Sequence, residues 1–121
     1  MSSTGCADSN PLFETIRLKV ADGLTALASG GQSAVTLDNT SSFHRVTTVA
    51  SGNDSKTLPK AKSGLVVIVA NAAAANSLNV FPALGDAINA LSANSAFAVA
   101  ANKVCLFICA SDGQWHCLTT A

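Results

Sequence analysis

Charged side chains are scarce in this chain of 121 residues. Asp, Glu, Lys and Arg make up 12% of it, about half the usual share of roughly 25%. Seven basic residues balance seven acidic ones, so the formal net charge is zero. Proteins that bind nucleic acid or acidic membranes normally carry an excess of Lys and Arg. We therefore exclude both partners, and we expect self-association because little charge keeps the copies apart.

Long apolar runs are also missing. No stretch approaches the roughly 20 apolar residues that a transmembrane helix needs. The first ten residues, MSSTGCADSN, lack the basic and hydrophobic regions of a signal peptide. We therefore expect synthesis in the cytoplasm. The length suits one domain, large enough to bury about two-thirds of the surface that the unfolded chain exposes.

Side chains that could carry catalysis are few. The chain has two histidines, His44 and His116, and one glutamate, Glu14. No carboxylate stands in an orienting relation to either histidine, and no Gly-x-Ser-x-Gly sequence exposes a nucleophilic serine. The aspartates stand mostly in turn sequences such as LDN, GND and SDG, where a carboxylate bonds to nearby backbone amides. We predict no enzymatic activity and no cofactor, and interpret His44 as a strand residue with a local hydrogen bond or solvent contact.

The four cysteines lack the close pairing of a zinc site. Cys105 and Cys109 would lie about 13 Å apart along one strand, too far for both sulfurs to bind one tetrahedral zinc. The cytoplasm also disfavours disulfides. We therefore predict unpaired, metal-free cysteines that pack as small apolar side chains, namely Cys6, Cys105, Cys109 and Cys117.

Two regions are distinguished by their pattern. Residues 1–13 are mostly polar with little to bury, which predicts an N-terminal arm, and residues 14–121 form a single β domain. The sequence ETIRLKV, residues 14–20, alternates polar and apolar side chains, which favours a half-buried strand with Ile16, Leu18 and Val20 on one face. A helical stripe through the same region is the alternative, weakened by Gly23.

Short apolar segments follow one another at near-regular spacing, separated by Gly, Asn, Asp, Ser and Pro. This rhythm predicts an all-β fold, a small antiparallel β-sandwich or barrel of jelly-roll type. Residues 65–70 and 104–110 are apolar at both parities, so we expect one face against the opposite sheet and the other against a neighbouring subunit or loop. The alanine-rich residues 70–77 are interpreted as a loop. The expected strands are AVTL, FHRVTTVA, GLVVIVAN, LNVFPA, AINAL, AFAVAA, KVCLFICA and QWHCLTT.

Large side chains in these segments are candidates for anchors of the core or of a trimer. We select Trp115, Phe107 and Val67, because large apolar side chains contribute most to burial. A platform on which a sugar stacks is the alternative role for Trp115. Three lysines, Lys56, Lys60 and Lys62, stand close to Pro59, which indicates either a solvated loop or a patch that meets an acidic partner.

The second half of the chain carries an ordered set of turn and strand residues, and this order resembles capsid decoration (cement) proteins and head-fibre modules of tailed bacteriophages. Prolines in this set suit strand ends, and glycines suit the turns between antiparallel strands. The set begins with Leu58-Pro59 and Gly64, continues through Asn71, Val80, Pro82, Gly85-Asp86 and Ile88-Asn89, and closes with Asp112-Gly113 and Trp115.

The resemblance implies a β-rich homotrimer on the virion surface, bound to the major capsid protein. The alternative is a fibre or spike module that recognises a host-surface glycan, but the long repetitive shaft of a fibre is missing. For contact with the capsid we select Leu12 and Phe13 of the arm as apolar anchors, together with Lys56, Lys60 and Lys62.

Overall fold

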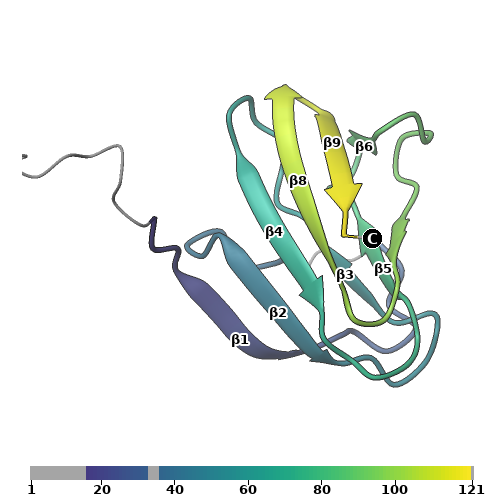
Figure 1. Cartoon of the computed structure of the whole chain (residues 1–121). Coiled ribbons are helices and arrows are strands. Elements are labelled where there is room, and N and C mark those ends of the chain that lie inside the picture. The colour runs from purple at the N-terminus through teal and green to yellow at the C-terminus, as the bar shows by residue number, and fades with distance from the viewer. Residues whose placement is uncertain (1–15, 33–35, 121) are drawn as a thin grey trace, which may run out of the picture.

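The protein is all β, as the sequence predicts. The structure, a computed structural model, describes residues 16–32 and 36–120, and these residues contain no helix (Figure 1). The expected strands from residue 43 onward are each found, six of them with shorter bounds, whereas the one expected at residues 103–110 extends to Ser111. A strand at residues 55–57 is not among those predicted. The expected strand AVTL lies partly outside the described residues. The strands are β1 (Val20–Thr25), β2 (Phe43–Thr48), β3 (Ser55–Thr57), β4 (Val66–Asn71), β5 (Leu78–Phe81), β6 (Ala87–Ile88), β7 (Phe97–Val99), β8 (Lys103–Ser111) and β9 (Gln114–Thr119).

The strands form two sheets. The large sheet has the order β1-β2-β4-β8-β9-β6 and the small sheet the order β3-β5-β7. Figure 1 shows β1, β2, β4, β8 and β9 side by side. Between β2 and β5 the chain passes alternately through the two sheets, so that β2 pairs with β4 and β3 pairs with β5, both in parallel. This part of the chain therefore winds as the coils of a β-solenoid.

The antiparallel topology expected for the sandwich is found only in the C-terminal part. There β8 pairs with β4 and with β9, and β7 pairs with β5, each antiparallel. The pairs β1-β2, β2-β4 and β3-β5 are parallel instead, and so is the C-terminal pair β6-β9. Alternation along a segment indicates a strand but not its partner, and the connections here are long enough to cross between sheets.

The first strand begins later than the alternation of residues 14–20 predicts. Residues 16–19 are not in a strand, and β1 starts at Val20. The carbonyl of Lys19 accepts hydrogen bonds from the amides of Ser42 and Phe43, 3.0 and 3.2 Å away, and ladder pairing begins one residue later. Ile16, Leu18 and Val20 are 82%, 39% and 52% exposed, so the expected half-buried face is wrong at all three positions. The alternation describes the polarity of the side chains but does not determine what covers them.

The core lies between the two sheets. Phe107 on β8 and Trp115 on β9 are fully buried, and Val67 on β4 is nearly so. The ring of Phe107 lies nearly perpendicular to the rings of Phe97 and Trp115, at centroid distances of 6.2 and 6.4 Å. This is the T-shaped geometry that aromatic pairs favour. The three predicted anchors are therefore core residues within one chain, and Trp115 offers no surface on which a sugar could stack.

The alanine-rich segment is a loop from residue 72 to residue 77, as predicted, whereas its first two residues, Ala70 and Asn71, end β4. It follows β4 and is held by the buried side chain of Asn71. The amide nitrogen of Asn71 donates to the carbonyls of Asn76 and Val99 at 3.1 and 2.9 Å, and its oxygen accepts from the backbone amide of Ala73 at 3.2 Å. Asn76 itself has a positive φ of 73°, which asparagine tolerates better than most residues. Small alanine side chains let this turn pass close to the sheet end.

Replacement of Trp115 by Ala tests the core directly. Because the indole is fully buried against Phe107, we expect a loss of about 3–5 kcal/mol in the free energy of unfolding. Urea denaturation followed by circular dichroism measures this loss. A variant as stable as the unaltered protein would contradict the burial of Trp115.

Candidate functional site

The described residues offer no metal-binding cluster. No three His, Cys, Asp or Glu side chains in residues 16–32 and 36–120 come together in a way that could hold a metal ion. His44 on β2 is buried, whereas His116 on β9 is exposed. Neither histidine is bonded to a carboxylate in this part of the chain.

His44 has the local hydrogen bond that the sequence predicts. Its Nε2 lies 3.1 Å from the carbonyl oxygen of Ser41, so Nε2 carries the proton and donates it. Nδ1 is buried without a partner. Burial lowers the pKa of His44, while the Ser41 hydrogen bond and the charge of Asp38 act in the opposite direction. The ring is therefore held neutral inside the fold.

The described cysteines are free thiols. Cys105 and Cys117 lie on neighbouring strands, and Phe107, two residues after Cys105, is paired with Cys117. A hydrogen bond to Cys117 together with burial raises the pKa of Cys105, and the same bond lowers the pKa of Cys117. The Cys109 thiol donates to the carbonyl of Ser111 at 3.0 Å. Cys6 lies outside the described residues.

A groove lies where two corners of the winding chain meet. One wall is formed by residues 38–42, which precede β2, and the other by residues between 59 and 67, which lead from β3 into β4. The groove has a volume of about 430 Å³, and we call it the corner groove. Lys60 and Lys62 line it, and Leu65 and Val66 make part of the wall apolar.

The predicted cluster of three lysines in one loop is wrong. Lys56 lies within β3 and borders a different hollow of about 350 Å³, next to residues 25–28. Its neighbours Ser55 and Thr57 are buried, so Lys56 points away from the core, and partial burial lowers its pKa. Because β3 ends at Thr57, the chain turns between Lys56 and the other two lysines. Leu12 and Phe13, the other predicted contact residues, lie outside the described residues.

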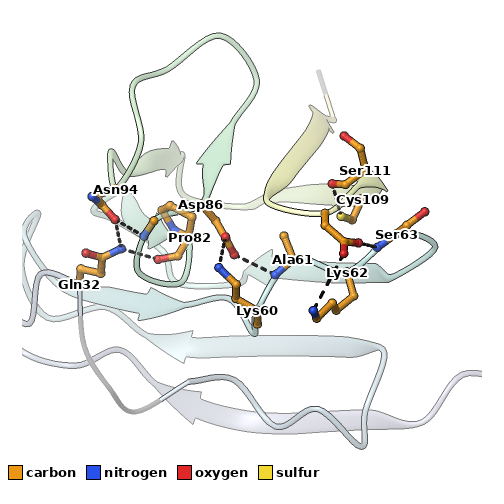
Figure 2. A network of polar contacts seen from close by, with 12 residues as sticks. Gln32, Lys60, Ala61, Lys62, Ser63, Pro82, Asp86, Asn94, Cys109 and Ser111 are labelled. Carbon is orange, nitrogen blue, oxygen red and sulfur yellow. Dashed lines mark hydrogen bonds and ion pairs between the residues drawn. The ribbon is translucent and has the colours of Figure 1, made fainter.

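Lys60 is bound to a buried carboxylate. Its Nζ lies 2.6 Å from Oδ1 of Asp86, whose side chain is only 1% exposed. Oδ2 of Asp86 accepts the backbone amide of Ala61 at 2.8 Å. Figure 2 shows both contacts crossing between the two segments. Lys60 therefore pairs with a carboxylate that the fold buries, so its ammonium group has a structural role.

Lys62 repeats the same arrangement at the surface. Its Nζ lies 4.0 Å from Oδ2 of Asp112, and Oδ1 of Asp112 accepts the backbone amide of Ser63 at 2.9 Å. Both charged side chains are largely exposed. An exposed pair at this distance contributes about 0–1 kcal/mol, so Lys62 can exchange Asp112 for another acidic group at little cost. Of the three predicted lysines, Lys62 is the one best placed to meet a partner.

A second set of polar contacts secures the loop that follows β5. Gln32 donates through Nε2 to the carbonyl of Pro82 at 2.8 Å and to Oδ1 of Asn94 at 3.1 Å (Figure 2). The same Asn94 oxygen accepts the backbone amide of Gly85 at 2.7 Å. These bonds connect segments distant in sequence, so the loop that carries Asp86 is held from two sides.

One accessible apolar feature is a sheet face that the sequence indicated only in part. Cross-strand partners point to the same side of a sheet. Val20 is paired with Phe43, Phe43 with Ile68, Ile68 with Leu106, and Leu106 with Leu118, so one apolar row crosses β1, β2, β4, β8 and β9. We call the side of the large sheet that carries this row the outer face. It is opposite the core.

Val66 and Ile108 form a second apolar pair on the outer face. The double apolar parity of residues 65–70 and 104–110 predicted such a face. One half of that prediction is confirmed, because Val67, Val69, Cys105 and Phe107 pack into the core. The expected cover by a neighbouring subunit stays a prediction. The alignment of five strands into one row depends on pairing partners that no local pattern contains.

Comparisons with protein-family models, with curated proteins and with solved structures give no match to this chain. No helix in the described part of the chain is long and apolar enough to cross a membrane.

Asp86 and Asp112 are suited to a comparison by mutation. Each carboxylate binds a lysine side chain and the backbone amide of the residue that follows that lysine. We expect Asp86→Ala to lower the free energy of unfolding by about 1–3 kcal/mol, because it leaves the buried amide of Ala61 without its acceptor, whereas the Lys60 side chain that it also releases is 57% exposed. Asp112→Ala should cost less than about 1 kcal/mol. Urea denaturation of both variants measures the difference, and equal losses would refute the distinction.

His44 makes the stability depend on pH. Because its pKa is lowered in the folded protein, the unfolded chain binds more protons below the ordinary value of 6.5, and protonation favours unfolding. Stability is therefore fully present above that pH and should fall below it, by up to about 1.4 kcal/mol per pH unit. Thermal unfolding between pH 7.5 and 5 measures the slope.

Two substitutions separate the histidines. His44→Gln should flatten the slope between pH 7.5 and 5, because the amide can still donate to Ser41 but does not titrate. His116→Gln, at an exposed position, should leave the slope as it is. If the second variant and not the first removes the pH dependence, His44 is not its origin.

Proposed function

We propose that this chain is a non-enzymatic structural protein of a tailed-bacteriophage virion, a decoration protein that binds the outside of the capsid as a homotrimer and stabilises the head. The sequence support is the order of turn and strand residues between Leu58 and Trp115, which resembles that class. In this fold Pro59 and Pro82 lie outside the strands, and Gly64, Gly85 and Gly113 have positive φ values between 84° and 94°. Part of the resemblance therefore concerns residues that shape turns.

The observation that carries the proposal is how the polar side chains are used. Asp86, Asn71 and Gln32 hold segments of the fold together, and the described residues contain no metal cluster. What remains accessible is an apolar sheet face and the corner groove with Lys62 at its side. These are features of a protein that works through contact with other proteins.

For the capsid contact we select the corner groove. It combines an apolar wall at Leu65 and Val66 with the ammonium group of Lys62, which suits an extended acidic segment of the major capsid protein. Leu12 and Phe13 of the arm add apolar anchors in this proposal. Three copies on one trimer would bind with avidity, because the first contact raises the effective concentration of the others.

The number of copies in purified virions tests the proposal. Quantitative mass spectrometry should find hundreds of copies per particle, as decoration of a capsid lattice requires. A handful or a few dozen copies would favour the alternative, a fibre or spike module that binds a glycan. Absence from the particle would overturn both.

Rebinding to particles stripped of the protein then tests the groove. Lys62→Glu should weaken rebinding about tenfold or more, because it replaces attraction by repulsion. Lys56→Glu serves as the control, since this lysine lies in β3 and borders a different hollow from the corner groove. Deletion of residues 1–13 should leave a folded protein that rebinds weakly. Equal rebinding of all variants would remove both contacts from the proposal.

A further inference from the structure

The outer face is exposed although it is apolar. Leu118 is 64% exposed, Val66 46% and Ile108 40%, and these residues lie on three different strands of the large sheet. Val20 extends the same face to the edge strand β1 and is also exposed. Single exposed apolar residues are common on soluble proteins, but a contiguous group aligned across five strands is not.

The outer face is also almost free of charge. Among the outward-pointing residues of β2, β4, β8 and β9, taken from the pairing parity, Arg45 is the one Lys, Arg, Asp or Glu, and His116 on β9 points to the same side opposite Ile108. Its guanidinium group is paired with Asp22 of β1 at 2.9 Å. The centre of the face, formed by Ile68 and Leu106, carries no polar group at all. A partner with strong charge therefore has nothing to pair with here.

The face has the size of the main apolar patch of a single chain. Neighbouring strands lie about 4.8 Å apart, so five strands span roughly 19 Å, and four of them, β1, β2, β4 and β9, have six residues each and extend for about 20 Å. The product, about 400 Å², lies within the roughly 300–600 Å² found for the largest apolar patch on a monomer, which is often functional. It is about half of the roughly 800 Å² that each partner contributes to a stable interface, so a contact through this face also uses residues around it.

We propose that the outer face is the contact surface between copies of this chain. A face without net charge, apolar at its centre, is complementary to itself, and the whole chain also has zero net charge, so no long-range repulsion opposes association. The contact follows from the face alone. Only the number of copies, three, rests on the proposed function, in which three outer faces turn toward one axis.

The outer face carries both a hollow and a projecting side chain, the two features that an interlocking contact needs. A hollow of about 280 Å³ lies at one end of it, lined in part by Phe43, Arg45, Ala70 and Val104. Leu118 projects from β9 on the same side of the sheet. A leucine side chain from a second copy fits the chemistry of such a hollow, with Phe43, Ala70 and Val104 around its methyl groups. Burial of Leu118 in this way would make it a central residue of the contact.

The test compares two exposed leucines. Leu118 lies on the outer face, and Leu84, which is 78% exposed, lies in the loop between β5 and β6. We expect the unaltered protein to show an oligomeric mass by light scattering at micromolar concentration. Leu118→Asp should raise the dissociation constant about 100-fold or more, because association would bury an unpaired carboxylate. Leu84→Asp should leave the mass unchanged.

Circular dichroism and thermal unfolding accompany each variant, and Ile108→Asp and the milder Leu118→Ser provide a second and a third substitution on the face. A monomeric unaltered protein overturns the inference. So does an oligomer that survives both Asp substitutions on the face, or one that Leu84→Asp dissociates. The outcome is separate from the proposed function. An oligomer that dissociates on Leu118→Asp but is absent from virions leaves this inference standing, whereas a monomer that decorates particles refutes it.

Discussion

Carboxylates at the corners of the winding chain are the contacts on which the rest of the structure depends. Parallel strands in one sheet need connections that leave the sheet and return, and backbone amides in those connections have no ladder partner. Asp54 accepts the amides of Ser29, Ala50 and Ser51 at 3.0–3.2 Å, and these hydrogen bonds lower its pKa. Asp86 likewise accepts a hydrogen bond from the backbone amide of Ala61. Each corner is thereby fixed where a plain loop would leave unpaired groups.

Fixed corners determine what the surface can do. Because Asp86 is buried, Lys60 is committed to it, and Lys62 is left as the more available lysine of the corner groove. The same windings set β2, β4, β8 and β9 side by side in a register that aligns the apolar row of the outer face. The polar groups at these corners bond within the fold itself, and the apolar outer face is left accessible.

The sequence predicts the all-β class, the alanine-rich loop and the role of aspartates in turns, because each depends on residues close together in the chain. It also identifies Trp115 and Phe107 as core residues from their size. It does not predict the parallel pairing or the start of β1, since periodicity contains no information on partners. Asp86 lies 26 residues after Lys60, so the pair that separates Lys60 from Lys62 is invisible locally. For the same reason, the sequence predicts an apolar face on two of these strands but not its alignment across five strands.

The central claim is that the outer face is covered by further copies in solution. Hydroxyl-radical footprinting of the unaltered protein, read by mass spectrometry at increasing protein concentration, tests it at individual side chains. Leu118 and Leu84 are both well exposed in the single chain, so they should react at similar rates at high dilution. At micromolar concentration we expect Leu118 and Ile108 to become protected while Leu84 stays reactive. Labelling of Leu118 as rapid as that of Leu84 at every concentration would contradict the account.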